Sequence, residues 1–453
     1  MMSRWPPGRP GSGFRRVRGG ATGDCHQSQN DTPERCSDER GGELSPAESH
    51  ETERHGKKGM NVLVLNCGSS SLKFAVIDPD TSVEHVSGIA QRLGSPEASL
   101  DVKQNGTKTS KPIAGALHDE ALHAIVDVLR ELGLADGLLA VGHRVVHGGS
   151  KFAGSMAITP EVIAKVEECI PLGPLHNPPN LVGIRIAQNL FPGLLQVGVF
   201  DTAFHQTMPP VAYTYPVPHE WLEKYGVRRY GFHGTSHRFV AREAVRLLGL
   251  PADDHGIVTA HLGNGCSCAA VKNGRSVDTT MGLTPLEGLM MGTRSGSIDP
   301  AIIGHVADAM GKHPKEILDV LNKKSGLLGV SGLSNDMRTV EEAAAGGNEK
   351  AKLALDLFCY ALAKAIAALV VPLGRLDALV FTGGIGENST TVRQMTIERL
   401  GFLGLTLDAA ANATHGRAQR GRITTGDRPQ ALIVPTNEEL MIAEDAERIA
   451  RGV

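Results

Sequence analysis

The sequence predicts an α/β fold built from two similar halves, and three observations support this prediction. Strand-like and helix-like apolar patterns are mixed along the chain from Met60 onward. Segments 61–78 and 256–274 each contain a strand, a turn with glycine and a second strand. Glycine makes up 54 of 453 residues, about 12% against a usual ~7%. This excess indicates many tight turns and places where the backbone approaches a ligand.

The composition narrows the class of protein. The 46 basic and 49 acidic side chains leave a net charge of −3, which argues against a nucleic-acid partner. A hydrophobic share of 41% is enough for a buried core. The 7 cysteines form no C-x-x-C pair, so we expect reduced thiols in a cytoplasmic protein. The apolar run 353–373 is interrupted by Asp356 and Lys364, and we interpret it as a buried helix and not as a membrane span.

Residues 1–59 differ from the rest of the chain. They show no apolar periodicity, and we predict a disordered N-terminal extension. The arginine-rich, acid-poor first twenty residues leave an organelle transit peptide as an alternative. The pair Arg15-Arg16 is not followed by an apolar segment, as a twin-arginine signal would be. We favour an extension without catalytic role, because a strand pattern begins immediately after Met60.

The first half then contains strands and helices in turn. We expect a strand–turn–strand unit at 61–78, an amphipathic helix at 118–134, a strand ending in a polar turn at 138–149, a helix from Pro160, a proline-rich segment at 171–180, a further helix, and a strand at 194–205.

The second half restarts the pattern. At an offset of 195 residues, Asn66 aligns with His261 and Gly68 with Gly263. Segment 376–389 is predicted to be a buried strand followed by a glycine-rich turn, and 435–453 ends the chain as a short helix. Turns of this kind present backbone N–H groups to anions. Two such hairpins facing each other would hold a polyphosphate.

Several side chains fit that chemistry. Lys73 follows Ser69, Ser70 and Ser71, and Asn66 near the end of its strand is suited to hold a metal-bound water. Arg144 and Arg294 lie among glycines, where a planar guanidinium suits a carboxylate or phosphoryl oxygen. Asp201 ends a strand, where ligands of open α/β sheets bind. Walker A and G-x-G-x-x-G motifs are absent from the sequence. Taken together, these features favour a two-domain α/β phosphotransferase.

The order of several short strings carries a resemblance to one family. The chain contains NCGSSSLKF, GHRVVHGG, PLHNPPN, VFDTAFH, YGFHGTSH, HLGNGCS, TPLEGLMMGTRSGSIDP, FTGGIGENS and PTNEEL. From Met60 to the C-terminus it resembles the acetate kinases, which belong to the actin-like ATPase superfamily. The resemblance implies two similar actin-like ATPase (ribonuclease H-like) domains flanking a nucleotide cleft. The N-terminal acyl- and phosphate-binding domain would comprise 60–205 plus 438–453, and the nucleotide-binding domain would comprise 206–437.

The resemblance also implies phosphoryl transfer between ATP and acetate with Mg²⁺, or with Mn²⁺ in its place, in a cytoplasmic homodimer. It assigns Asp201, His233 and Arg294 to catalysis, and Asn66 and Glu438 to the metal. The implied acyl-site residues are Arg144 for the carboxylate and Val146, Leu175, Phe232 and Pro285 for the methyl group. The implied ATP-binding residues are Lys73, His261, Leu262, Gly263, Asn264, Gly265, Asp336, Met337, Arg338, Gly384, Ile385, Gly386, Glu387 and Asn388.

Physical chemistry modifies two of these implied roles. Acetate is already ionised near neutral pH, so a general base has little to do. We therefore expect Asp201 to position Mg²⁺, its waters or Arg294. Met337 stands where an aromatic residue is expected beside the adenine, so the chain lacks aromatic stacking there.

Two alternatives remain. A propionate or butyrate kinase of the same family would differ in the size of the acyl pocket. An actin-like or chaperone ATPase without acyl kinase activity would need a peptide-binding module or polymer contacts.

Overall fold

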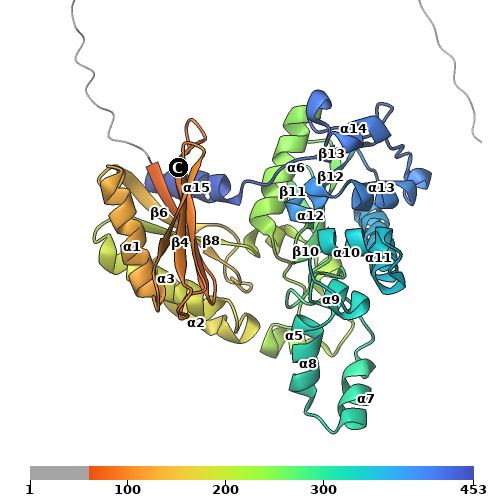
Figure 1. Cartoon of the computed structure of the whole chain (residues 1–453), viewed down its shortest axis with the longest axis horizontal. Helices are drawn as coiled ribbons and strands as arrows, with labels where there is room; N and C mark the ends of the chain where they lie inside the picture. The colour runs from red at the N-terminus through yellow and green to blue at the C-terminus, as the bar shows by residue number, and fades with distance from the viewer. Residues whose placement is uncertain (1–60) are drawn as a thin grey trace, which may run out of the picture. The chain divides into compact units, whose positions relative to one another are not determined.

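The computed structural model describes residues 61–453. The predicted disordered extension, 1–59, lies outside these residues. The described part contains an eight-stranded sheet and a five-stranded sheet with helices around them (Figure 1). The predicted α/β class is therefore confirmed.

The first sheet has the strand order β5-β4-β3-β2-β1-β6-β8-β7. Its strands β1 to β5 pair antiparallel in succession, whereas β1, β6 and β8 run parallel. The bounds are β1 Asn61–Cys67, β2 Ser71–Asp78, β3 Val83–Gln91, β4 Ser99–Gln104, β5 Thr107–Pro112, β6 Leu138–Val145, β7 Met156–Ala157 and β8 Leu195–Phe200.

The second sheet has the order β11-β10-β9-β12-β13. Its strands are β9 Gly256–Leu262, β10 Cys266–Lys272, β11 Arg275–Thr279, β12 Ala378–Thr382 and β13 Gln430–Ile433. The hairpin β9–β10 and the pair β10–β11 are antiparallel, and β9, β12 and β13 are parallel.

The two sheets repeat one arrangement. Strands β3-β2-β1-β6-β8 have the same order and the same relative directions as β11-β10-β9-β12-β13. The strands of the first hairpin begin at Asn61 and Ser71 and those of the second at Gly256 and Cys266, so both offsets are 195 residues. The internal repeat predicted from a few matching residues is therefore confirmed by the strand order and by the equal spacing of the two hairpins.

Helices cover both sheets. In the first half these are α1 His118–Glu131, α2 Pro160–Glu168, α3 Asn177–Leu190, α4 Pro210–Tyr213, α5 His219–Tyr225 and α6 Gly234–Leu248. In the second half they are α7 Ala301–Met310, α8 Pro314–Lys323, α9 Gly326–Ser331, α10 Met337–Ala345, α11 Glu349–Leu373, α12 Gly383–Asn388, α13 Thr390–Glu398, α14 Ala409–Ala413 and α15 Glu438–Ala450. Short 3₁₀ helices lie at Ile170–Leu172, Ala203–Thr207, Gly401–Leu403 and Arg417–Gln419.

The last helix, α15, packs on the first sheet although the second sheet precedes it in the chain (Figure 1). A glycine makes this close approach possible. A Cβ at Gly142 on β6 would lie 2.6 Å from Ile442 Cγ2 of α15. The contact brings the first residue of α15, Glu438, to the parallel strands of the first sheet.

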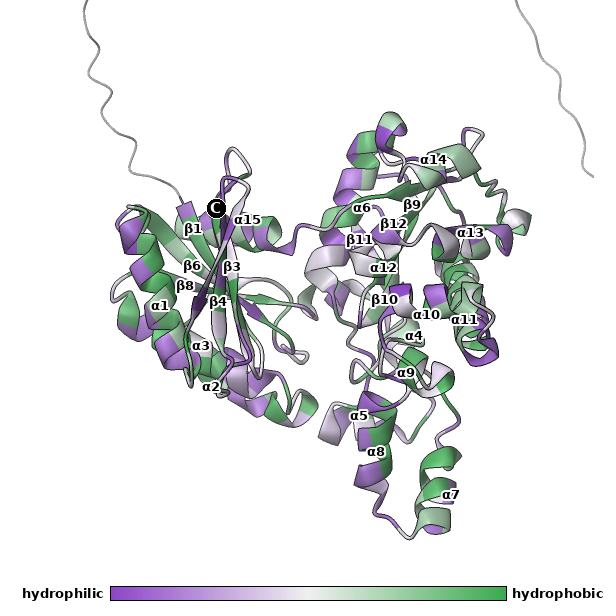
Figure 2. Ribbon diagram, viewed as in Figure 1, coloured by the Kyte–Doolittle hydropathy of each residue, from purple (hydrophilic) through white to green (hydrophobic). Residues whose placement is uncertain are grey.

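Helix α11 is apolar and long enough to cross a membrane by length and composition alone. Figure 2 shows it mostly green. Its buried residues, including Phe358, Leu362 and Ile366, belong to the largest hydrophobic cluster of the second half. This packing supports the interpretation of α11 as a core helix. The five cysteines among the described residues are free thiols, and all are buried.

The structure corrects the prediction for segment 383–388. This segment was expected to be a glycine-rich turn, but it forms the short helix α12. Gly383 has φ +77°, and a Cβ there would lie 2.8 Å from the Leu262 carbonyl oxygen. Glycine therefore allows the chain to turn sharply from β12 into a helix, and a sequence pattern of several glycines does not distinguish this from a turn.

Candidate active site

Arg144 and Asp201 lie at the end of two adjacent parallel strands. Arg144 pairs with Val199 across β6 and β8, and Asp201 follows the last residue of β8. Arg144 Nε lies 2.9 Å from Asp201 Oδ1, and Arg144 Nη2 lies 2.6 Å from Oδ2. The Asp201 side chain is only 1% exposed. One edge of the guanidinium therefore binds both carboxylate oxygens in bidentate geometry.

Two further groups face Arg144. Glu438 Oε2 lies 3.8 Å from Arg144 Nε, and Asn66 Oδ1 lies 3.5 Å from Nη1. Burial raises the pKa of Glu438, and nearby Asp201 adds to this rise while Arg144 opposes it. Burial alone would lower the pKa of Arg144, but Asp201 and Glu438 outweigh it and raise that pKa. The guanidinium is thus held charged among two carboxylates.

The oxygens of Asn66, Asp201 and Glu438 are of the kind that Mg²⁺ prefers. Within residues 61–453, however, no group of three or more His, Cys, Asp or Glu side chains is placed to hold a metal ion. Magnesium usually uses one or two carboxylates together with substrate phosphates and water. The residues present therefore fit a metal that arrives with a nucleotide, and not a closed protein site.

His233 lies at the start of α6 in a left-handed backbone conformation, φ +56°. Non-glycine residues in this region are strained and cluster at functional sites. The residue that follows His233 is held close to β8. Gly234 N donates to the Asp201 carbonyl over 3.0 Å, and a Cβ at Gly234 would lie 2.2 Å from that oxygen. The close contact joins the start of α6 to the end of β8.

His233 belongs to a group of buried histidines. Its ring stacks on His261, with centroids 4.3 Å apart, and His237 lies behind it at 6.4 Å. Burial lowers the pKa of His261 to about 4. Burial, together with His261 and His237, holds the pKa of His233 well below its usual range. These rings are therefore uncharged at neutral pH.

Arg294 lies in the loop between β11 and α7. Its Nη1 donates to the Pro285 carbonyl over 3.1 Å, and among the described residues no carboxylate pairs with it. Burial lowers the pKa of Arg294. A Cβ at Gly265 would lie 3.4 Å from Arg294 Nη1 and 3.5 Å from His233 Nε2. The β9–β10 turn, His233 and Arg294 therefore meet at one place.

A cavity of about 380 Å³ opens beside that turn. It is lined by Gly263, Asn264, Asn335, Asp336, Met337, Arg338, Glu341, Gly384, Ile385, Asn388 and Ser389. Eight of these are predicted ATP-binding residues, and Asn335, Glu341 and Ser389 are not. A Cβ at Gly384 meets nothing within 4 Å, so this glycine faces open space.

The sequence of the chain was compared with those of known protein families and proteins. The model of the Acetokinase family matches residues 61–444. The acetate kinase of Chromobacterium violaceum is 53% identical over 390 residues, covering 86% of this chain and 98% of that protein. Acetate kinase 1 of Neisseria meningitidis serogroup B is 55% identical over 391 residues, with coverage of 86% and 98%.

The chain belongs to the acetokinase family. Solved structures agree in fold. A propionate kinase of Francisella tularensis has a TM-score of 0.82 and 44% identity, covering 86% of this chain and 100% of that one. An acetate kinase of Porphyromonas gingivalis has a TM-score of 0.80 and 46% identity with the same coverage. The predicted actin-like ATPase fold class is thereby confirmed.

Six predicted ATP-binding residues do not line this cavity: Lys73, His261, Leu262, Gly265, Gly386 and Glu387. Glu387 Oε1 accepts from Gly383 N over 2.9 Å, so its carboxylate stabilises the start of α12. Lys73 is exposed on β2, opposite Asn66 in the register of the first hairpin. Met337 does line the cavity, but it is only 4% exposed and belongs to the hydrophobic core, so it offers little surface to a base.

The acyl-site residues are partly brought together. Val146 packs against the core cluster that contains Phe232. Pro285 is joined to Arg294 through its carbonyl. Leu175 is 60% exposed, so its side chain is available to a ligand or to a closing segment. Asp201, which was expected to position Mg²⁺, its waters or Arg294, pairs with Arg144 in the structure.

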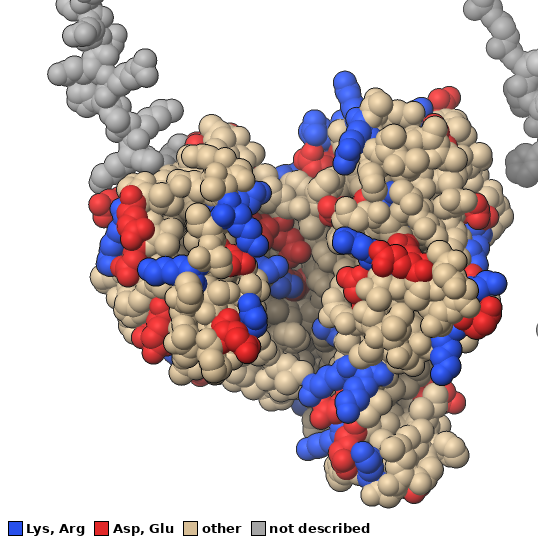
Figure 3. Space-filling model, in the orientation of Figure 1, with Lys and Arg blue, Asp and Glu red and all other residues tan. Residues whose placement is uncertain are grey.

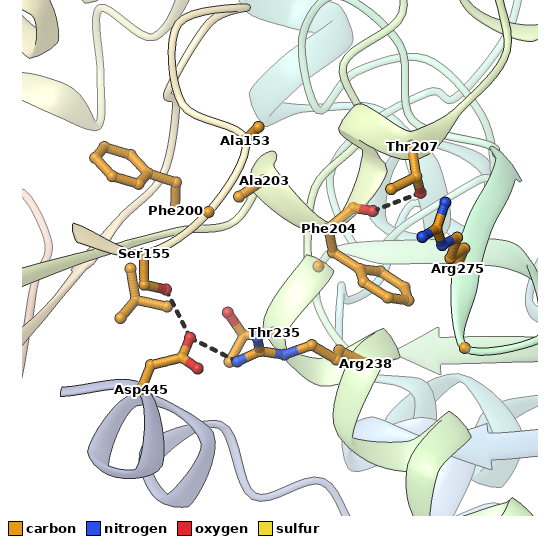
Figure 4. A pocket seen from close by; sticks show the side chains of 14 residues that line it. Ala153, Ser155, Phe200, Ala203, Phe204, Thr207, Thr235, Arg238, Arg275 and Asp445 are labelled. Atoms are coloured by element: carbon orange, nitrogen blue, oxygen red, sulfur yellow. Dashed lines mark hydrogen bonds and ion pairs between the residues drawn. The ribbon is translucent and has the colours of Figure 1, made fainter. Parts of the chain in front are cut away.

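No sequence pattern predicted the residues that support the site by holding its helices in place. Ser389 caps α13 and donates to Glu341, and both roles need the folded chain. Figure 4 shows another such place, a cavity of about 160 Å³ beside Gly234. There Asp445 of α15 accepts from Ser155 Oγ over 2.6 Å and from Arg238 Nη2 over 2.7 Å, tying α15 to α6.

Figure 3 shows the face of the described chain that is hollowed. Acidic and basic side chains both appear on the walls of this hollow.

Proposed function

We propose that this acetokinase transfers the γ-phosphoryl group of ATP directly and reversibly to acetate, forming ADP and acetyl phosphate. The observation that carries the proposal is the isolation of Arg294. Its guanidinium lies beside His233 and has no carboxylate partner among residues 61–453. A partly buried cation without a counter-ion favours an anionic ligand. The transferring phosphoryl group is such a ligand, and its charge must be neutralised during transfer.

The nucleoside would bind in the cavity between the β9–β10 turn and α12. Gly384 faces this space without a side chain, so a nucleoside can approach the backbone. The phosphates would extend toward His261, Gly265 and Lys73. A pyrophosphate-dependent enzyme would be expected to fill this space with larger side chains.

Acetate would bind to the free edge of Arg144. A guanidinium has five N–H donors, and Asp201 uses the Nε–Nη2 edge. Within residues 61–453, the Nη1–Nη2 edge has only the 3.5 Å contact to Asn66 besides the Nη2 bond to Asp201. A carboxylate can therefore bind there in a second bidentate pair.

Asp201 would act by orientation and not as a general base. Both of its oxygens accept hydrogen bonds from Arg144, and acetate has no proton to lose near neutral pH. We infer that Asp201 fixes the plane of Arg144 and so the direction of the attacking carboxylate. In-line phosphoryl transfer depends mainly on such alignment.

Magnesium would be held by Asn66 and Glu438, with the nucleotide phosphates and water completing the shell. When bound, it would neutralise charge on the phosphate oxygens. The raised pKa of Glu438 reflects burial beside Asp201, and a cation would compensate for it. Mn²⁺ has similar ligand preferences and is expected to substitute.

The methyl group of acetate would contact Val146, Leu175, Phe232 and Pro285. One additional methylene changes binding in such a pocket by only ~1–3 kcal/mol. A propionate or butyrate kinase is therefore the nearest alternative, and one related structure is named a propionate kinase. The curated relatives at 53% and 55% identity are named acetate kinases, which favours acetate. An actin-like ATPase without acyl kinase activity is disfavoured, because Arg144 and the apolar side chains would then lack a ligand.

The domain organisation and assembly are part of this proposal. Residues 60–205 with 438–453 would bind the acyl and phosphate groups, and 206–437 would bind the nucleotide. Closure of the two domains would exclude water and suppress ATP hydrolysis.

We also propose that the chain forms a homodimer. The exposed residues Leu353, Leu357 and Tyr360 form an apolar stripe on α11, at 59%, 41% and 54% exposure. We expect a second copy of the chain to cover this stripe, in a cytoplasmic homodimer.

The test is trapping of the acyl phosphate with hydroxylamine. ATP, GTP and pyrophosphate would be supplied as donors, and acetate, propionate and butyrate as acceptors. We expect the highest kcat/KM with ATP and acetate, weaker turnover of propionate, and no product with pyrophosphate. Absence of trapped product from every pair would overturn the proposal.

A further inference from the structure

A chain of four side chains runs from the second sheet to His233. Thr259 on β9 lies with its Oγ1 2.7 Å from His237 Nδ1. On the other side of that ring, His237 Nε2 lies 2.8 Å from Ser267 Oγ on β10. Ser267 Oγ in turn lies 2.8 Å from His233 Nδ1. Thr259, His237 and Ser267 are fully buried, so these contacts are shielded from water.

The number of protons in this chain limits how it can be arranged. Ser267 has one hydroxyl proton and contacts one nitrogen of each ring. It therefore donates to one ring and must accept from the other. Burial holds the pKa of both His233 and His237 well below the usual range, so each ring carries one proton. The tautomers of the two rings are then coupled through Ser267.

Only two arrangements satisfy all three contacts between these four side chains. In the first, Thr259 donates to the Ala269 carbonyl over 3.4 Å, and both histidines carry their proton on Nδ1. In the second, Thr259 donates to His237 Nδ1, His237 Nε2–H donates to Ser267, and Ser267 donates to His233 Nδ1. The number of protons is the same in both. The second arrangement gives up only the long contact to Ala269.

The arrangements differ in what His233 presents at its other nitrogen. Nε2 lies at the place where Arg294 Nη1 and the β9–β10 turn converge, 3.5 Å from the position of a Cβ at Gly265. The first arrangement directs a lone pair into this space, which repels an anionic oxygen. The second directs an N–H donor into it, beside the Arg294 cation. Stacking of the rings of His233 and His261 at 4.3 Å fixes the ring plane in either case.

We propose that Thr259, His237 and Ser267 are positioning residues that place the single proton of His233 on Nε2 when the phosphoryl group is bound. His233 then stabilises the transferring group as a neutral hydrogen-bond donor, and Arg294 supplies the positive charge. The Thr259 hydroxyl thus determines the tautomer of His233 through His237 and Ser267, without contacting His233 itself. This inference rests on the proposed role of His233 in phosphoryl transfer.

The direct test is neutron diffraction from the perdeuterated full chain with ADP, Mg²⁺, fluoroaluminate and acetate. We expect deuterium on His233 Nε2 and none on Nδ1, with the Ser267 hydroxyl directed to His233 and the Thr259 hydroxyl directed to His237. Deuterium on both nitrogens of His233, or on Nδ1 alone, would overturn the inference.

A double-mutant cycle tests the same inference in solution. Ser267→Ala and Thr259→Val are each expected to lower kcat about tenfold, because the donor is no longer fixed. The KM values for ATP and acetate should change less than about twofold. Thr259→Ser retains the hydroxyl and should keep near-normal kcat, which separates loss of the proton position from loss of packing.

Measuring Ser267→Ala in the His233→Gln background distinguishes a positioning role of Ser267 from a structural one. A glutamine amide brings its own N–H toward the position of Nε2 and has no tautomer to fix. Ser267→Ala should therefore cost less than about twofold in that background. An equal loss in both backgrounds would mean a structural role and would overturn the inference. If His233→Ala itself keeps normal kcat, the proposed role of His233 fails, which is a separate outcome.

Discussion

Asp201 accepts two hydrogen bonds from one edge of the Arg144 guanidinium, at 2.9 Å and 2.6 Å. This relationship joins two residues that are 57 positions apart in the chain. It satisfies both oxygens of a buried carboxylate and leaves the Nη1–Nη2 edge of the arginine for a ligand. The pair is the basis of the first prediction.

Asp201→Asn should impair metal-dependent phosphoryl transfer. The amide removes one negative charge beside Glu438 and weakens the hold on Arg144. We expect the Mg²⁺ concentration for half-maximal rate to rise about tenfold and kcat to fall. The measurement is a Mg²⁺ titration of initial rates at several pH values. An unchanged metal requirement with only a shifted pH profile would instead indicate general-base chemistry.

Val146→Ala should widen the acyl pocket. The change removes two methyl carbons from a side chain that packs against the cluster containing Phe232. We expect kcat/KM for propionate and butyrate to rise relative to acetate by about tenfold, within the ~1–3 kcal/mol available per methylene. Leu175→Ala is the matched change at an exposed position. The pocket assignment is wrong if neither variant changes the ratio.

Two adjacent glycines should respond differently to substitution. Gly384 faces the cavity, so Gly384→Val should raise the KM for ATP about tenfold, or roughly 1.4 kcal/mol, with little change in stability. Gly383 has φ +77° and lies against Leu262, so Gly383→Ala should lower the free energy of unfolding by roughly 1–2 kcal/mol. Urea unfolding and initial rates measured on both variants check the two outcomes.

The buried histidines should make the fold sensitive to acid. Burial lowers the pKa of His143, His205 and His261 to about 4, against about 6.5 in the unfolded chain. The unfolded state therefore binds more protons between these values, and stability falls as the pH falls from about 6.5 toward 4. At pH 5 each histidine accounts for roughly 1–2 kcal/mol of the loss.

Urea unfolding at pH 7 and pH 5 measures this loss. His143→Gln is the variant of choice, because His143 contacts Gln196 and no substrate is proposed to bind there. It should flatten the pH dependence. A free energy of unfolding that is equal at both pH values would contradict the neutral state of these rings.

The apolar stripe on α11 should be an interface between two copies. Leu357→Asp and Tyr360→Asp place charge on it and should convert a dimer to a monomer in light-scattering measurements. Phe402→Asp is the control, since Phe402 is 75% exposed on a different element. A monomeric unmodified chain, or dissociation by the control alone, would exclude this face.

The sequence was informative where local pattern decides structure. The hairpins, the buried α11 and the final helix follow from apolar periodicity and turn residues. It was wrong for 383–388, because glycines permit a turn and a tight helix start equally. The boundary of α1 also differs: 118–134 was predicted, whereas the helix ends at Glu131, before Gly133 with φ +67°.

By itself the sequence determined the duplicated α/β architecture and the set of polar residues at strand ends. Only the tertiary structure decided which side chains pair: Arg144 with Asp201, and Ser267 with both His233 and His237. The reason is physical. Strand and helix patterns arise from the periodicity of neighbouring residues, whereas a hydrogen bond between side chains needs atoms placed within about 3 Å by elements far apart in sequence.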